Sequence, residues 1–515
     1  MATETEIGSS ESESAGHGVL KPNAVGLIGV VFMVVAFSAP ITAMTGNVPV
    51  AVGYGNGLGA PAGFIVACVI LTIFSVGFVA MAKHITAAGA FYTFVSRGIS
   101  RPVGLGAGVM SMLAYMLIEA ALIGLFSVFC QSTMLSQFDI DIPWIVYGVI
   151  GMAVIGILSY RDISLATKVL GVVLVIEVLL LSLMAFAVLF KGGGPDGLMP
   201  GSLNPAKAFQ TDGLSEGVAG LGLLFAFWSW VGFEATAIYG EESKDPKKIV
   251  PRATLVAVIG IGVFYTFISW MAVAGNGAEQ SIVIAQSAEP FELLYTPMRD
   301  YVGEWGVKGF EWFVIGGSFA CALAIHNSAT RYLFAFGRDG LLPRSLGKAH
   351  PRHQSPAVAS TFQTVFTVVV VLGAYVADVD PYLELYVLLA VFATVALLAV
   401  QSLTAVACIW YFHVKKQHPE TANVFRTILS PVIGGLGMIY VNYLLLSNLS
   451  SAAGAAAETW FGRALPYLVL ASFVVPVLVA LYWRKSNPAK YAAIGSTIFT
   501  HAGLTTDIDE PTVSR

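Results

Sequence analysis

Three carboxylic acids lie deep inside long apolar stretches of the sequence, at Glu119, Glu177 and Glu234. Ionisable side chains at such a depth are costly in a membrane and are functional candidates by default. Burial disfavours the charged form of a carboxyl group, so such an acid could exchange protons near neutral pH. Glu177 and Glu234 are therefore predicted to bind and release protons. Glu119 has little around it to suggest more than a hydrogen-bonded structural acid.

Two apolar stretches are interrupted near their middles. The first contains Pro40 within residues 38–46, and the second contains Gly232 beside Glu234 within residues 228–236. Taken singly, a proline kink and a tightly packed glycine explain them. Taken together, they lie five helices apart, as in transporters built from inverted repeats, which bind substrate between two broken helices. Freed amide groups suit a carboxylate and freed carbonyls suit an ammonium group, and a zwitterionic amino acid needs both.

The chain as a whole is far more apolar than a soluble protein. Of its 515 residues 56% are hydrophobic and 11% are charged, and its mean hydropathy is +0.77. Soluble globular proteins carry about 25% charged residues. The four cysteines form no CxxC pair, so no metal and no redox cofactor is expected. The net charge of −4 gives no indication that the protein binds nucleic acid. Because the composition is so apolar, the predicted fold class is an all-α integral membrane protein in a lipid bilayer.

Twelve apolar blocks are long enough to cross the membrane, because a bilayer core needs about 20 apolar residues in a helix. Glycine and proline within them are compatible with membrane helices. The blocks cover approximately residues 24–52, 61–82, 104–131, 143–160, 168–190, 216–240, 253–274, 311–333, 357–377, 384–411, 427–447 and 464–483.

Lysine and arginine give the orientation, since they are enriched in cytoplasmic loops. With the N-terminus inside, only five of the 27 basic residues fall outside the cell: Lys191, Lys207, Arg299, Lys308 and Arg463. Missing one helix in the middle would invert the later loops and destroy this asymmetry. The sequence therefore predicts a multi-pass protein of the cytoplasmic membrane with both termini in the cytosol.

The predicted organisation has a central transport core and polar ends. Residues 1–22 are acidic and contain no basic residue before Lys21, which predicts a disordered cytosolic tail rather than a signal peptide. Residues 23–411 form the ten-helix core, with repeats at about 23–190 and 215–411. Residues 412–485 add two transmembrane helices. Residues 486–515 form a second cytosolic tail, which is expected to be disordered from Asn487 onward.

Four stretches resemble the motifs of the amino acid–polyamine–organocation (APC) permeases. The most specific is GFEATAIYGEESKDPKKIVPRA at residues 232–253. The others are NSATR at 327–331 with GRDGLLP at 337–343 and Ser-Pro at 355–356, AGAFY at 88–92 before Arg97-Gly98, and the broken first span. They occur in order within residues 23–411, and the last two spans match the family only in number.

The resemblance implies a LeuT-like core of two inverted five-helix repeats, with substrate between the breaks of helices one and six. The first break would face the substrate carboxylate and the second its amine, while Trp228 and Glu234 match gating or coupling positions. Glu177 matches roughly the place on helix five where a charged group replaces a sodium ion in proton-coupled members. Trp228, Trp230 and Phe233 could enclose an apolar side chain or form a gate. The predicted substrate-binding residues are Thr42, Ala43, Met44, Thr45, Gly46, Trp228, Val231, Gly232 and Phe233.

The sequence thus predicts a secondary active transporter of amino acids or related organic amines, proton-coupled, working as a monomer or homodimer. Amino acid/polyamine exchange and sodium-coupled symport, to which hydroxyls such as Ser318 could contribute, stay open as alternatives. So does a membrane sensor that binds an amino acid without transporting it.

Three further classes are disfavoured. A channel would show a pore loop or a ring of charges. An enzyme or an ATP-driven pump would show a catalytic triad, a zinc motif or a Walker A loop, and the sequence has none. The histidines are expected at or beyond span ends, at His84, His326, His350, His353, His413 and His418. No catalytic residue is therefore predicted, and the protein is expected not to be an enzyme.

Overall fold

The computed structural model describes residues 26–85, 89–160, 163–211, 217–238, 243–351, 355–447, 459–500 and 503–506. The predicted N-terminal tail, residues 1–22, lies outside them. Within the described residues the fold is all-α, as predicted, apart from one antiparallel hairpin of β1 (Thr497–Thr500) and β2 (Gly503–Thr506).

Ten described helical segments are long and apolar enough to cross a bilayer. The shorter apolar helices α6 (Trp144–Tyr160) and α8 (Ala219–Trp228) occupy the predicted fourth and sixth spans. The ten segments are α1 with α2 (Leu27–Gly53), η2 with α3 (Gly57–Ala82), α5 (Arg101–Phe138), α7 (Ile163–Phe190), α10 (Pro246–Asn276), α13 (Glu304–Arg338), α14 (Ala357–Val376), η6, α15 and η7 (Pro381–Val414), η8 and α16 (Phe425–Ser447), and α18 (Trp460–Ser486).

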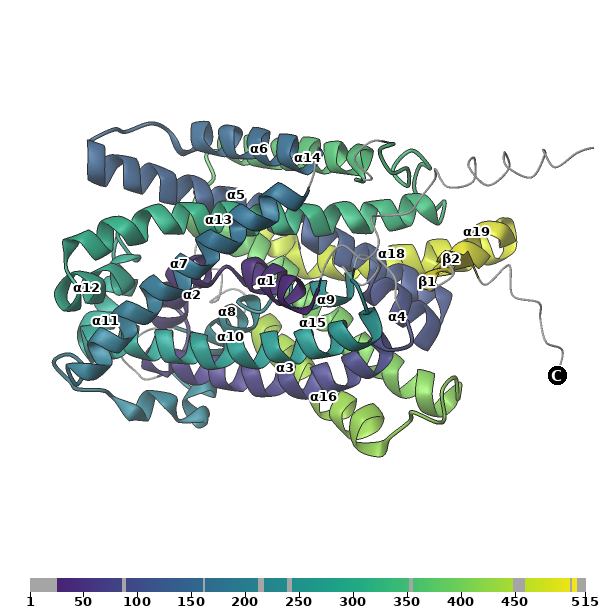
Figure 1. The fold of residues 1–515 in the computed structure, drawn as a ribbon, viewed down its shortest axis with the longest axis horizontal. Helices are drawn as coiled ribbons and strands as arrows, with labels where there is room; N and C mark the ends of the chain where they lie inside the picture. Colours follow the sequence, from purple (N-terminus) through teal and green to yellow (C-terminus); the bar gives the residue numbers. More distant parts are fainter. Residues whose placement is uncertain are drawn as a thin grey trace, which may run out of the picture.

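The long helices run lengthwise through one bundle (Figure 1). Helices α6 and α14 pack together along one edge of it, and α3 and α16 pack together along the opposite edge. Short helices outside the twelve predicted spans lie at the two ends. These are α4 (Phe91–Gly98) and α19 (Pro488–Ala493) at one end, and α11 (Ala278–Ala285) and α12 (Glu292–Tyr301) at the other.

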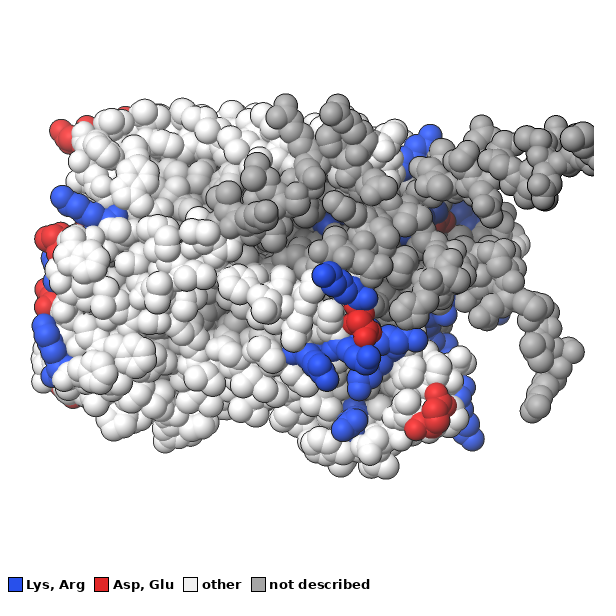
Figure 2. Space-filling model, in the orientation of Figure 1, with Lys and Arg blue, Asp and Glu red and all other residues white. Residues whose placement is uncertain are grey.

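The surface has the charge distribution of a membrane protein. On the face shown in Figure 2, Lys, Arg, Asp and Glu gather toward the two ends, and an uncharged band lies between them. Large apolar side chains are exposed around the bundle, where a bilayer would cover them. Examples are Val172, Leu179, Val263, Val369, Leu436 and Leu470, each at least 60% exposed.

The first span is broken at one residue. Helix α1 (Leu27–Ser38) is followed by Ala39, which has a left-handed backbone with φ 37°, and α2 (Pro40–Gly53) begins directly after it. Pro40 has no N–H to continue the hydrogen-bond ladder of α1, and its fixed φ suits the first position of a new helix. The predicted interruption is therefore present.

The sixth span is broken over a longer stretch. Helix α8 ends at Trp228, residues 229–234 form turns, and α9 (Ala235–Ile238) follows. Gly232 has φ +103°, which an L side chain rarely adopts. Helix α2 packs against α8, while α1 packs against α9 and α10, so the two broken spans lie side by side.

Two predictions about particular segments are wrong. Residues after Asn487 are not uniformly disordered, since α19 forms and Ile494 and Ser496 are buried. The reason is that this segment packs on the bundle: the amide of Gly495 donates to the Tyr92 hydroxyl. His326 does not lie at a span end either, because α13 extends to Arg338 and buries it completely.

Candidate functional site

A small cavity lies where the two broken spans meet. It has a volume of about 30 Å³, and its lining residues come from both broken spans and from α5, α13 and η6. This is room for one or two water molecules, and an amino acid does not fit without movement of side chains. Among the described residues no charged side chain lines it; the lining side chains with polar or sulfur atoms are Ser38, Thr42, Asn47, Trp228, Ser229, Cys321 and Tyr386.

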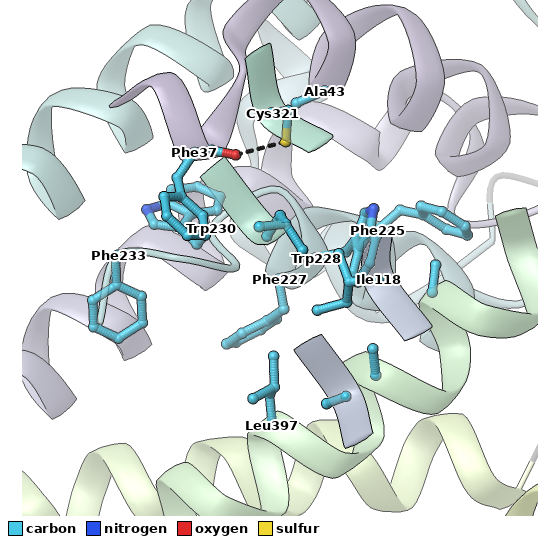
Figure 3. Packing of buried hydrophobic residues seen from close by; sticks show 14 of the residues in the cluster. Phe37, Ala43, Ile118, Phe225, Phe227, Trp228, Trp230, Phe233, Cys321 and Leu397 are labelled. Atoms are coloured by element: carbon cyan, nitrogen blue, oxygen red, sulfur yellow. Dashed lines mark hydrogen bonds between the residues drawn. The ribbon is translucent and has the colours of Figure 1, made fainter. Parts of the chain in front are cut away.

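The break at Ala39 leaves backbone groups of both half-helices without helical partners. The carbonyl of Phe37 accepts from the Cys321 thiol at 2.9 Å (Figure 3), and that of Ser38 accepts from the Tyr265 hydroxyl at 2.6 Å. At the start of α2, by contrast, no described group bonds to the amide or the buried hydroxyl of Thr42. Helix N-termini favour anions, so this end of α2 suits a carboxylate.

The second break presents the opposite polarity. The carbonyls of Ser229 and Val231, two residues that line the cavity, accept no hydrogen bond from any described group. Their oxygens suit an ammonium group. Glu234 closes the break itself: its carboxylate accepts from the Gly232 amide at 3.2 Å and from the Tyr115 hydroxyl at 2.5 Å. It is fully buried and does not line the cavity.

Four polar side chains join the two breaks to η6 (Pro381–Tyr386). The Asn47 amide donates to the Ser229 hydroxyl at 2.7 Å, and the Tyr386 hydroxyl donates to the Asn47 oxygen at 2.5 Å. The indole N–H of Trp228 donates to the Tyr386 hydroxyl at 2.8 Å. This polar network connects three segments that are distant in the sequence and forms one wall of the cavity.

Comparison with known proteins agrees with this geometry. A model of the family described as "Amino acid permease" matches residues 25–475. The chain belongs to the amino acid permease family. The predicted resemblance to APC permeases is thereby confirmed, and with it the prediction of a membrane transporter.

Several characterised proteins are similar to this permease along most of its length. The branched-chain amino acid permease BcaP of Bacillus subtilis (strain 168) is 24% identical over 76% of this chain and 81% of its own length. The low-affinity putrescine importer PlaP of Escherichia coli (strain K12) is 22% identical over 88% of this chain and 94% of its own. The methylthioribose transporter of Bacillus subtilis (strain 168) is 25% identical over 60% of this chain and 59% of its own.

The predicted substrate residues of the permease separate into two groups. Thr42, Ala43, Trp228 and Val231 line the cavity. The other five pack away from it. Met44 and Thr45 are buried in α2, Gly46 faces Leu125, Gly232 faces Phe37, and Phe233 packs on Phe74 and Phe78. In Figure 3 Trp228 lies beside Ile118, and Phe233 lies apart from both.

Sequence reasoning missed Asn47 and Tyr386 as site residues of the permease. Asn47 carried a usable signal, because it is an amide in an apolar span directly after the predicted break. Tyr386 carried none, since nothing in the tenth span predicts that its hydroxyl meets residues 47 and 228. Their hydrogen bonds connect positions 339 and 158 residues apart.

Glu177 lies beside the first break of the permease, outside the cavity lining. It is buried on α7, and its carboxylate interacts with the backbone amide of Ile41 at the start of α2. On its other side it packs against Gly317 of α13, where an added Cβ would lie 2.6 Å from a carboxylate oxygen. The second carboxylate oxygen has no hydrogen-bond partner among the described residues.

Glu119 has a partner that the sequence did not suggest. Its carboxylate lies 3.0 Å from Nδ1 of His326 on α13, and it accepts from the Gln363 amide of α14 at 2.7 Å. The other ring nitrogen of His326 lies 2.9 Å from the Ser360 hydroxyl. Glu119 and His326 are at most 1% exposed, so the permease holds an acid and a base together inside its bundle.

Proposed function

We propose that the protein imports a neutral amino acid across the cytoplasmic membrane by alternating access, coupled to protons. The observation that carries this is the pair of opposed backbone ends at the cavity. The free Thr42 amide and hydroxyl would bind the substrate carboxylate, and the carbonyls of Ser229 and Val231 would bind its ammonium group.

The cavity lining favours an uncharged substrate side chain. A diamine such as putrescine has two ammonium groups and no carboxylate, and in the part of the chain that the structure describes no acidic side chain lines this cavity. Burying an unpaired charge there would be costly. Apolar Ile118, Leu122 and Ile325 also line the cavity and would contact an aliphatic side chain. BcaP, one of the similar proteins, is a branched-chain amino acid permease.

Proton coupling is proposed at Glu177. Its carboxylate lies between the N-terminal end of α2 and helix α13, and both of these elements contribute residues to the cavity wall. Movement of the first break would therefore change both its hydrogen bonding and its access to water, and burial of an unpaired charge makes its protonation depend on that access. Glu234 is proposed as a second coupling residue, because it closes the break of the sixth span.

The proposed architecture has twelve spans, a LeuT-like core in residues 23–411, two added helices in residues 412–485 and both termini in the cytosol. The adjacent breaks, five spans apart, support the inverted repeats. The exposed Lys248 at the start of α10 supports a cytosolic location for that end.

The deciding experiment is counterflow of radiolabelled amino acids in liposomes that contain only this protein. We expect exchange with neutral amino acids and little with putrescine or methylthioribose. Thr42→Val removes the unpaired hydroxyl with little change of shape and should weaken substrate binding roughly fivefold, the effect of one hydrogen bond. Thr45→Val is the matched control, because Thr45 also has a buried unpartnered hydroxyl but does not line the cavity.

Three outcomes would redirect the proposal. Binding without counterflow would make the protein a sensor. Exchange without net uptake under any pH gradient would make it an exchanger. Uptake that requires sodium would make sodium, rather than the proton, the coupling ion.

A further inference from the structure

The buried pair of Glu119 and His326 has no part in the function proposed above, and it lies directly behind the cavity wall. Ile118 and Ile325, the residues that precede each member of the pair, both line the cavity. The pair itself points the other way, toward Ser360 and Gln363 of α14. A change in the pair would therefore act on the back of the cavity wall.

The hydrogen bonds of the pair leave room for one exchangeable proton. A hydrogen must lie between the Glu119 oxygen and Nδ1 of His326, which are 3.0 Å apart. Nε2 faces the Ser360 hydroxyl at 2.9 Å, and a hydroxyl can either donate to a neutral ring or accept from a protonated one. The site can thus hold a net charge of −1 or zero without losing a hydrogen bond.

The surroundings favour the neutral, protonated pair when water is excluded. Helix α14 contains no Asp, Glu, Lys, Arg or His, and its one tyrosine, Tyr375, lies at its far end. On α5, Tyr115 donates to Glu234, and on α13 the Cys321 thiol donates to the Phe37 carbonyl. Further ionisable groups on the pair's own helices include Arg331, Tyr332 and Glu311 on α13, and those on helices packed against them include Tyr147 and Tyr160 on α6 and Glu177 on α7. An unpaired negative charge there would be costly, so loss of the proton requires access to water.

A route to water reaches the first turn of α14. A crevice of about 340 Å³ is lined by Ala357 and Thr361, which flank Ser360, and by Lys348 and His350. In the proposed orientation this crevice opens on the cytosolic side. Ser360 itself is buried and does not line the crevice, but the next residue, Thr361, does, so Ser360 separates the crevice from His326.

We propose that Glu119 and His326 form a proton-binding site that exchanges with the cytosol through Ser360 and alters the cavity wall through Ile118 and Ile325. The site is additional to Glu177. Because binding linkage is reciprocal, protonation of the pair changes substrate affinity and substrate changes its protonation.

The test has one measurement that needs no substrate. Infrared difference spectra of the purified protein are recorded between about pH 5 and about pH 8, the range in which an imidazole changes charge. We expect a titrating signal in wild type that is absent from His326→Gln and from Glu119→Gln. Glu311→Gln is the matched control, since this carboxylate also joins α13 to α5, through Ser136 and Gln137, but lies at the opposite end of the bundle. A His326→Gln spectrum identical to wild type would overturn the site.

The second measurement is the counterflow rate at different internal pH. In wild type and Glu311→Gln we expect it to change about fivefold over that range, the lower end of typical couplings between sites. In Glu119→Gln and His326→Gln we expect a clearly smaller change, because only the contribution of Glu177 and Glu234 remains. If the pair were purely structural, these substitutions would lower the stability of the protein but leave the pH profile of the folded fraction unchanged. That result would refute the proposal. If wild type exchanges no amino acid, the proposed function fails while the infrared result still decides the proton site.

Discussion

The indole of Trp228 donates a hydrogen bond of 2.8 Å to the hydroxyl of Tyr386 and so holds the sixth span against the tenth across the cavity. With this bond in place the cavity measures only about 30 Å³. We expect substrate entry to separate these two side chains, since both line the cavity.

The first prediction concerns this hydrogen bond. Trp228→Phe removes the donor and some volume, so the protein no longer has to break the bond to bind substrate. We expect substrate affinity to rise about fivefold, which corresponds to the roughly 1 kcal/mol of one hydrogen bond. Isothermal titration calorimetry measures it. Trp230→Phe is the control, because its N–H donates to the Val258 carbonyl away from the cavity. Weaker binding by Trp228→Phe would show that the indole binds substrate instead.

The second prediction concerns Gly232. It has φ +103°, and an added Cβ would lie 2.3 Å from a ring carbon of Phe37. Backbone strain alone costs about 1 to 3 kcal/mol. Gly232→Ala should lower the free energy of unfolding by more than this, since the steric overlap with Phe37 adds to the strain. Gly340→Ala is a matched control with φ +72° and no atom within 4 Å of the new Cβ. Thermal unfolding in detergent compares them, and equal losses would exclude a role for Phe37. The larger Gly232→Leu should abolish substrate binding by displacing Phe37 into the cavity.

The third prediction concerns Glu177. Glu177→Gln mimics the protonated acid at similar volume, so substrate binding and counterflow should be retained. Accumulation driven by a pH gradient should be lost, because no proton can be released when the first break moves. Uptake into liposomes with an imposed pH gradient measures this. Normal accumulation by the variant would assign the proton to another group, with Glu234 the next candidate. Glu234→Gln should weaken binding itself, since it loosens the second break.

The fourth prediction concerns orientation. Cysteine in place of Lys248, at the start of α10, should be protected from an impermeant thiol reagent in intact cells. Cysteine in place of Asp300, at the end of α12, should be labelled. Three of the four native cysteines, Cys130, Cys321 and Cys408, are buried, and labelling of the partly exposed Cys68 is measured in the unsubstituted protein as the background. The reverse labelling pattern would contradict the proposed topology.

The fifth prediction concerns pH and the junction after α3. The rings of His84 and His418 stack at 3.9 Å, and burial together with the charge of His418 lowers the pKa of His84 to about 4. A histidine with a lowered folded-state pKa stabilises the fold above its unfolded pKa of about 6.5, and this contribution is lost as pH falls toward 4. The melting temperature should therefore fall on acidification, and less steeply in His84→Gln. A parallel pH profile for the variant would exclude this pair as the cause.

The sequence by itself determined the class of this protein, because membrane insertion depends on quantities that are local along the chain. Blocks of about 20 apolar residues and the position of lysine and arginine predict the spans and their orientation. The breaks were also local: Pro40 lacks a backbone donor, and Gly232 permits a left-handed backbone. The structure places both breaks where the sequence predicted them.

What only the tertiary structure decided is which side chains meet. Thr42 and Thr45 are three residues apart in one helix, yet only Thr42 reaches the cavity. Glu119 looked like an isolated acid until α13 brought His326, 207 residues away, to within 3.0 Å of it. Packing of apolar helices fixes such contacts, and in apolar spans the residues that surround each polar group give little indication of its partner. The polar network of Asn47, Ser229, Trp228 and Tyr386 forms only because two broken spans and η6 pack together, and their rotation about the helix axes is set by side-chain packing rather than by hydropathy.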